Sequence, residues 1–197
     1  MAAATRASGG KPAAAPPPGV LRVTHPGTGL SLDVPPDRKA TVRQRYDGPL
    51  RIFGVQVLPR IVRDGPQRPC GDGEDWNVLS VSGAPEAGLD LTIHDRPLDT
   101  TLDAVLNDPF TKITGTEILH AEPDLQIGPF RGFGVIRRMP AATQIKNGPE
   151  LSGPSMLRQI WLSRGGTALE LQGCALESQP DGQRAIDAMV GSLSAQT

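Results

Sequence analysis

The sequence has few aromatic residues, two cysteines, three histidines and almost no net charge. Among its 197 residues, aromatic side chains make up 4%, and 20 Lys and Arg stand against 21 Asp and Glu. Domains that bind nucleic acid through its phosphates usually carry a marked basic excess. The balance therefore excludes a uniformly basic nucleic-acid binder, and we expect no nucleic-acid partner.

Long hydrophobic runs are also missing. No apolar stretch approaches the roughly 20 residues that a helix needs to cross a bilayer, so we expect no transmembrane segment. The first residues lack the apolar stretch of a secretory signal and a lipobox cysteine. The compartment stays open: the cytoplasm is the default, and the cell envelope applies if a leader has been removed or the start is misplaced.

Ala and Pro dominate the start of the chain. Residues 1–20 offer no apolar set whose burial would offset the entropy of ordering them, which predicts a disordered tail. The remaining chain is long enough to bury one sizeable core. We therefore expect a single domain over 21–197.

Alternating apolar residues predict most of the strands. The expected strands are 30–34, 52–58, 76–82, 89–94, 117–127, 133–139, 156–163 and 167–176. The last two form the strongest signal, a hairpin around Gly165-Gly166, because glycine supplies the positive φ angles of tight turns. Residues 59–75 and 140–154 are rich in Pro and Gly and are expected to be long loops.

Two helices are expected. The first begins with Asp99 or Thr100 as its cap and breaks before Pro109. It restarts with Asp108 as cap and Pro109 as its first residue, and Phe110 and Ile113 continue the buried face. The second closes the chain and is capped at Asp181. Its expected buried residues are Ala185, Ile186, Met189, Val190 and Leu193. Short connections join antiparallel strands, so the order predicts an α+β fold with a largely antiparallel sheet covered by helices.

This order resembles the PsbP-like α/β/α sandwich superfamily. The resemblance rests on Gly29 to Pro35, Leu98 to Leu102, Ile127 to Phe133 and residues 156–194. Among its branches the chain is most similar to the actinobacterial LpqN-type lipoproteins, and second to the DcrB-like proteins and type VI secretion effector chaperones. The resemblance implies binding, assembly or chaperoning, with no shared catalytic residues, no cofactor and no metal.

The histidines are weak candidates for metal ligands or catalytic residues. His25, His94 and His120 lie far apart in the sequence, without the short spacing of metal ligands on one element. His94-Asp95 has the form of a base with its orienting acid, and His120 is followed by Glu122 and Asp124. Solvated strand ends explain both groups better than a site does.

Cys70 and Cys174 are the only cysteines. Cys174 is expected to be a buried, apolar-like thiol, and Cys70 to lie in an exposed loop. In an oxidising compartment the two thiols can form a bridge that closes a long loop, and this pairing stays open.

The glycine-rich segments have structural explanations that need no ligand. Residues 71–75 alternate acids with glycine but lack the spacing of a calcium loop, which favours a solvated acidic turn. Gly128, Gly132 and Gly134 match no phosphate-binding pattern, so entry into a strand explains them better.

Charge is distributed unevenly along the chain. Residues 37–68 carry eight Lys and Arg against three Asp and Glu, a surplus of +5, whereas residues 69–125 carry two against twelve, a deficit of −10. If the fold separates these segments, the near-neutral chain presents a dipole that steers a charged partner. Solvation of each face is the alternative.

These patterns favour a non-catalytic binding or chaperone-like module. We expect it to engage a protein or an amphiphilic ligand through its sheet face or the loops 59–75 and 140–154, and no ligand-binding residue can be named. One alternative is a type VI effector chaperone with an apolar groove for a partner helix. Another is a hydrolase whose site forms around His94 or His120.

Overall fold

The computed structural model describes residues 16–52, 55–70, 76–83, 87–109, 115–140 and 153–195. Its described elements are β1 (Leu21–Thr24), β2 (Leu30–Val34), β3 (Arg38–Arg43), β4 (Arg45–Ile52), β5 (Val55–Asp64), β6 (Arg68–Pro69), β7 (Val78–Gly83), β8 (Ala87–His94), α1 (Leu102–Leu106), β9 (Glu117–Ile127), β10 (Phe130–Met139), β11 (Ser155–Arg164), β12 (Thr167–Leu176), α3 (Pro180–Ser192) and β13 (Ser194–Ala195). The tail expected at 1–20 lies mostly outside the described residues.

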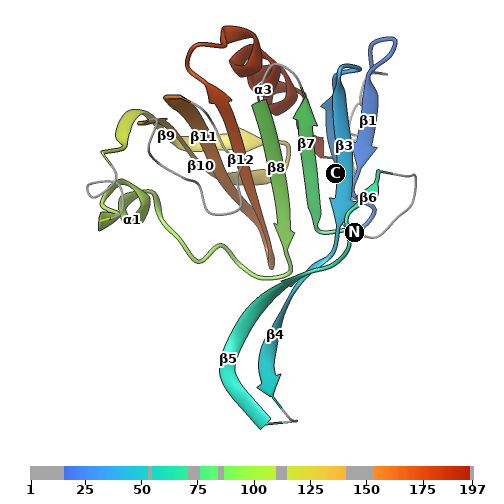
Figure 1. The fold of residues 1–197 in the computed structure, drawn as a ribbon, viewed down its shortest axis with the longest axis vertical. Helices are drawn as coiled ribbons and strands as arrows, with labels where there is room; N and C mark the ends of the chain where they lie inside the picture. The colour runs from blue at the N-terminus through green and yellow to red at the C-terminus, as the bar shows by residue number, and fades with distance from the viewer. Residues whose placement is uncertain are drawn as a thin grey trace, which may run out of the picture.

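An eight-stranded antiparallel sheet forms the centre of the molecule (Figure 1). Its strand order is β6-β3-β7-β8-β12-β11-β10-β9. A second sheet, β1-β2-β13, lies with α3 over one face, and α1 covers part of the other. Among the described helices, none is long and apolar enough to span a membrane. The expected α+β fold, a largely antiparallel sheet with helices, is confirmed.

The main core lies between the large sheet, the small sheet and α3. It combines Leu32 of β2, Leu91 of β8 and Met189 of α3, each almost fully buried. Consecutive strand residues point to opposite faces, so Ile160 of β11 joins this core while Trp161 packs under α1. Helix α3 lies so close to β12 that a Cβ at Gly173 would be 2.5 Å from Cγ2 of Ile186.

The predicted hairpin is confirmed in full register. Arg164 pairs with Thr167, and the two strands stay paired from there to Ser155 and Leu176. Gly165 has a φ of 57°, in the left-handed region that the turn requires. The strands expected at 30–34, 76–82, 89–94, 117–127 and 133–139 also form, with shifts of a few residues at their ends.

The caps predicted for α1 and α3 are wrong. Helix α1 is capped by Thr101, whose Oγ1 accepts a hydrogen bond from the Ala104 amide at 3.2 Å. Helix α3 is preceded by Gln179 and begins at Pro180, so Asp181 falls in the first turn, where it pairs with Arg184. The break before Pro109 is confirmed, since α1 ends at Leu106. Phe110 and Ile113 lie outside the described residues.

The prediction of one strand at 52–58 followed by a long loop at 59–75 is wrong. The chain forms two paired strands, β4 and β5, and then the short strand β6. Pro59 suggested a loop, but it lies at a register shift between the pairs Gly48–Ile61 and Leu50–Leu58. At such a bulge the missing proline amide costs no ladder hydrogen bond. The acidic segment 71–75 and most of 140–154 lie outside the described residues.

Strands β4 and β5 form a two-stranded ribbon, here called the arm, that projects away from the body (Figure 1). Among the described strands, each pairs only with the other. Only Gln44 separates β3 from β4, so the arm continues the direction of β3 beyond the sheet.

Candidate interaction surface

One end of the large sheet carries α1, a single helical turn on the face opposite α3. Its side chains Leu102, Val105 and Leu106 pack around Phe133 of β10 and Trp161 of β11. The two aromatic rings stack with their centroids 5.1 Å apart. A helix this short is not stable alone, so these apolar contacts fix its position.

A buried cation also holds α1. Arg137 of β10 is buried, and its Nη2 donates a hydrogen bond to the carbonyl oxygen of Val105 at 3.0 Å. Burial lowers the pKa of the Arg137 guanidinium, and the nearby carboxylate of Asp108 partly offsets this effect. The last turn of α1 therefore receives a positive charge from the sheet, where the helix dipole favours one.

Strand β9 is the edge of the large sheet next to α1. It is eleven residues long and pairs with β10 on one side. Its register shifts twice, once near Leu119 and once near Pro123. Bulges and proline are devices that hinder backbone pairing at a sheet edge. At the first shift Leu119 is 45% exposed, which is high for a large apolar side chain.

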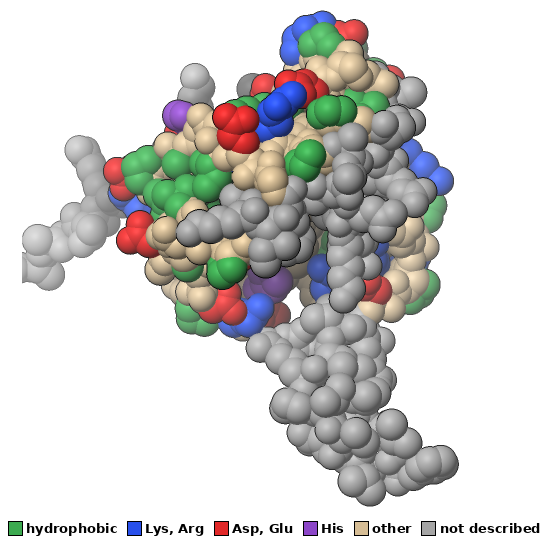
Figure 2. All heavy atoms as spheres, turned by 60° about the vertical axis from the view of Figure 1, so that its left-hand side comes forward, with side chains coloured by type: hydrophobic (Ala, Val, Ile, Leu, Met, Phe, Trp, Pro, Cys, Tyr) green, Lys and Arg blue, Asp and Glu red, His purple; other side chains and the backbone are tan. Residues whose placement is uncertain are grey.

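Apolar and acidic side chains share this end of the molecule. Leu98, Leu102, Leu106 and Ile118 are half-buried beside the exposed Leu119. Figure 2 shows hydrophobic side chains gathered over α1 and β9, with acidic side chains around them. We call this region the β9–α1 surface: Leu98, Leu102, Leu106, Ile118 and Leu119, with the exposed acids Asp103 and Asp124.

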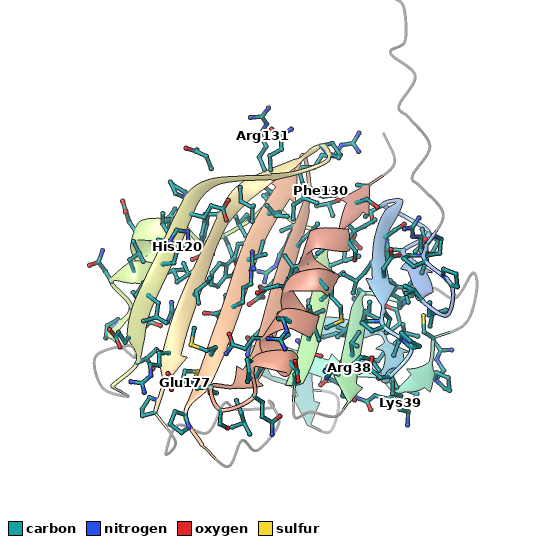
Figure 3. The ribbon with its side chains drawn as sticks, turned by 90° about the horizontal axis from the view of Figure 1, so that it is seen from above. Arg38, Lys39, His120, Phe130, Arg131 and Glu177 are labelled. Atoms are coloured by element: carbon teal, nitrogen blue, oxygen red, sulfur yellow. The ribbon has the colours of Figure 1, made fainter. Side chains whose placement is uncertain are left out.

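The opposite end of the sheet is basic. Arg38 and Lys39 of β3 lie there, far from His120 of β9 (Figure 3). The arm extends from this end and carries four Arg against two Asp over residues 45–64, a surplus of +2. Residues 95–127 carry two Lys and Arg against seven Asp and Glu, a deficit of −5. The fold thus separates the basic segment from the acidic residues of the β9–α1 surface.

The base of the arm is fixed to the body by Asn77. Its Oδ1 accepts a hydrogen bond from the Arg45 amide at 2.5 Å, and its Nδ2 donates to the Arg45 carbonyl oxygen. Arg45 Nε also contacts Asp64 Oδ1 at 2.7 Å, across the ribbon. The hydrogen bond from Arg45 lowers the pKa of the Asp64 carboxyl. These contacts tie the start of β4 and the end of β5 to the large sheet.

The centre of the sheet face that carries α1 is polar. Ser80, Asp90, Gln172 and Gln159 lie in one row across β7, β8, β12 and β11, and all four are half-buried. Oε1 of Gln159 is buried and has no hydrogen-bond partner among the described residues. The sheet face expected to bind a ligand is therefore polar at its centre and apolar near α1.

The candidate histidines do not come together. His94 ends β8, with its Nε2 3.6 Å from Oε2 of Glu170. His120 lies on β9, opposite Ile136, and is exposed. Three strands, β12, β11 and β10, separate the two. Among the described residues, no group of His, Cys, Asp and Glu is arranged to hold a metal ion.

The structure does not join Cys70 to Cys174, the pairing that the sequence leaves open. Cys174 is buried with Met139 and Leu157, whereas Cys70, expected in an exposed loop, is half-buried and packs against the main core. Burial raises the pKa of the Cys174 thiol, which agrees with its expected apolar environment.

The glycines near β10 serve the sheet. Gly128, with a φ of 56°, turns the chain between β9 and β10. A Cβ at Gly132 would lie 1.9 Å from the Trp161 carbonyl oxygen, so only glycine allows this approach of β10 to β11. The interpretation of these glycines as strand entry is confirmed.

Comparisons with known proteins give no family and two structural similarities at low sequence identity. No family model and no curated protein matches the chain. The solution structure of cyanobacterial PsbP (CyanoP) from Synechocystis sp. PCC 6803 has a TM-score of 0.48 and 12% identity, covering 95% of this chain and 98% of that one. A Pseudomonas aeruginosa protein of unknown function, PA94, has a TM-score of 0.44 and 14% identity, covering 77% and 99%.

No sequence pattern predicts the β9–α1 surface. Leu119 belongs to an expected strand, and its exposure comes from a bulge that no local pattern shows. The acidic character of the region was visible as the deficit over 69–125. Its position opposite the basic arm depends on the strand order.

Proposed function

We propose that this protein is a non-catalytic binding module that engages a protein segment through the β9–α1 surface. The exposed Leu119, beside four half-buried apolar side chains, is the observation that carries the proposal. An apolar patch rimmed by polar residues is typical of protein interaction sites. Docking a partner there would remove Leu119 from water.

The chemistry of the surface favours an apolar and basic partner. Asp103 and Asp124 are exposed acids, and β9 carries no Lys or Arg. Attraction between opposite charges speeds the encounter of the two partners. Salt screens this attraction, with a screening length of roughly 10 Å at 0.1 M. Binding that depends on these acids therefore decreases as salt rises.

A synthetic peptide of alternating Val and Arg, as long as β5, serves as a direct probe of the surface. We expect saturable binding by fluorescence anisotropy that weakens with salt, and weaker binding of the matched Val and Glu peptide. Leu119→Lys should weaken binding roughly ten- to a hundredfold, as loss of one buried Leu contact implies. Leu21→Lys, at the other large exposed apolar residue, is the control. Equal binding by both variants would exclude this surface.

Within the PsbP-like proteins, we propose the LpqN-type branch and a cell-envelope setting, with a type VI effector chaperone as the second choice. The apolar part of the β9–α1 surface supports either role, because a chaperone also needs an apolar docking area. A synthetic amphipathic helix tests the second choice. If it binds more tightly than the Val and Arg strand peptide, the chaperone role replaces the first.

A hydrolase is the alternative from another class. Its support is the contact between His94 and Glu170, which would orient a general base. Turnover of a p-nitrophenyl ester that is lost in His94→Ala and kept in His120→Ala would establish it and overturn the non-catalytic proposal.

A further inference from the structure

We infer that a row of polar side chains across the centre of the large sheet binds an aliphatic diamine, a small organic cation. The row consists of Ser80 of β7, Asp90 of β8, Gln172 of β12 and Gln159 of β11, and we call it the polar row. It lies on the four middle strands of the sheet, whereas the β9–α1 surface is built on the edge strand β9 and on α1 (Figure 1). The inference therefore goes beyond the proposed function.

The side chains of the polar row have no partner in the part of the chain that the structure describes. Cross-strand pairing places the four side chains next to one another, yet none of them makes a hydrogen bond or an ion pair with a described residue. All four are half-buried, and Oε1 of Gln159 is fully buried. A buried acceptor without a hydrogen bond destabilises the folded state, and in native structures it indicates a bound water or ligand. The Gln159 acceptor therefore needs a donor beyond the described residues.

The charge of the polar row favours a cation as this donor. Asp90 lies within the row, and Glu170 lies diagonally beside Asp90 on the next strand, where it also contacts His94 at 3.6 Å. Strands β7, β8 and β12 contain no Lys or Arg. In β11, Arg158 pairs with Asp187 of α3 on the opposite face, and the other Arg stands at the last position of the strand. No described Lys or Arg of the four middle strands therefore neutralises Asp90.

Basic side chains on the flanking strands do not fill this role. Nε of Arg43 on β3 lies 3.7 Å from Oδ1 of Asp64, and Arg137 of β10 donates its hydrogen bond to α1. Lys39 of β3 is exposed, and β7 separates its strand from that of Asp90. A positive ligand would thus supply Asp90 with the counter-charge that it lacks among the described residues.

An apolar cluster borders the polar row. Met139, Leu157 and Cys174 are buried together, and the last two lie on the same face as the row, each two residues from one of its members. Asp90 and Gln159 are two strand spacings apart, about 10 Å across the sheet. An aliphatic diamine matches this arrangement, because its two ammonium groups donate to Asp90 and Gln159 while its methylene groups pack against the apolar cluster.

Calorimetric titration of the full chain with three five-carbon ligands tests the inference. The ligands are cadaverine, which is the diamine, and the diol and the dicarboxylate of the same chain length. We expect saturable binding of cadaverine, binding at least about tenfold weaker for the diol, and no binding of the dicarboxylate, since hydrogen bonds between charged groups are the stronger ones. Equal affinity for the diamine and the diol would overturn the assignment of a cation, and no saturable binding of cadaverine would overturn the site.

Two substitutions in the polar row locate the binding. Asp90→Asn keeps the shape and removes the charge, and it should weaken cadaverine binding by about ten- to a hundredfold. Gln159→Leu removes the buried acceptor and should weaken binding by about tenfold. Circular dichroism confirms that each variant folds.

The matched control is Asp124→Asn, at an exposed acid of β9, which should leave the affinity for cadaverine unchanged. Unchanged affinity in a folded Asp90→Asn variant, or an equal loss in Asp90→Asn and Asp124→Asn, would overturn the inference. The Val and Arg peptide is titrated into the same variants. If it still binds while cadaverine does not, the proposed function survives without the diamine site.

Discussion

Asn77→Ala should loosen the arm without unfolding the body. Asn77 makes two side-chain hydrogen bonds to the backbone of Arg45, one as acceptor and one as donor. Its own amide and carbonyl, which bond to Arg43 and Ile93, are unchanged by the substitution. The perturbation therefore removes the side-chain clamp and leaves the pairing of β3, β7 and β8 in place.

The size of the effect follows from the two lost contacts. A hydrogen bond of this kind contributes about 0.5–1.5 kcal/mol, so the base of the arm loses about 1–3 kcal/mol of local stability. Hydrogen exchange reports this directly, since each 1.4 kcal/mol corresponds to about tenfold in an opening equilibrium. We expect faster exchange at the amides of β4 and β5, and unchanged exchange in β8 and β12.

Asn107→Ala is the matched control, because Asn107 also donates a side-chain hydrogen bond to a backbone carbonyl, that of Asp103 at 2.9 Å. It should change exchange only near α1. Unchanged protection of β4 and β5 in Asn77→Ala would refute the view that Asn77 fixes the arm. Equal loss of protection across the large sheet would show that Asn77 supports the whole fold instead.

Four further predictions follow from named contacts. Gly173→Ala should destabilise the protein by about 1–3 kcal/mol in urea unfolding, because its Cβ would lie 2.5 Å from the Ile186 side chain. The control Gly191→Ala on α3, whose Cβ would meet no atom within 4 Å, should stabilise the protein by about 0.4–1 kcal/mol. Equal effects of the two substitutions would contradict the close packing of α3 on β12. Arg137→Met should cost about 1–3 kcal/mol and raise exchange in α1, and unchanged α1 protection would count against its anchoring role. Maleimide should label native Cys70 first, and Cys174 slowly at neutral pH because its raised pKa leaves less thiolate; fewer than two reactive thiols in non-reducing denaturant would reinstate the bridge. The pKa of Asp64 is lower in the folded state, so its ion pair stabilises the arm base at pH values above the unfolded-state pKa, and this stabilisation is lost as the pH falls through the folded-state pKa. Hydrogen exchange in the arm, corrected for its intrinsic pH dependence, should therefore become faster only in that acidic range.

Elements with strong local signals could be predicted from the sequence. The hairpin of β11 and β12 has clean apolar runs around Gly165, and α3 places Ile186, Met189 and Val190 at helical spacing. Their positions need no information from distant residues. The same holds for β8, where Leu89 and Leu91 alternate with polar residues.

Features that depend on distant contacts could not be predicted. Pro59 indicates a loop locally, and only its place in a register shift makes it compatible with β5. The exposure of Leu119 arises from the pairing of β9 with β10. The two cysteines lie in separate apolar clusters, a fact that their sequence positions do not show.

The sequence predicts a basic segment followed by an acidic one, but only the strand order decides where these charges lie in space. Strand order places the basic β3 and the acidic β9 near opposite ends of one sheet. The separation is partial, because β3 pairs with β7, which belongs to the segment 69–125 that carries the deficit.

Hydrogen exchange in the presence of the Val and Arg peptide tests the central claim most directly. The account predicts slower exchange in α1 and β9 on addition of the peptide, with β1, which holds the exposed control residue Leu21, unchanged. Protection confined to other strands, or none at saturating peptide, would contradict the assignment of the β9–α1 surface as the binding site.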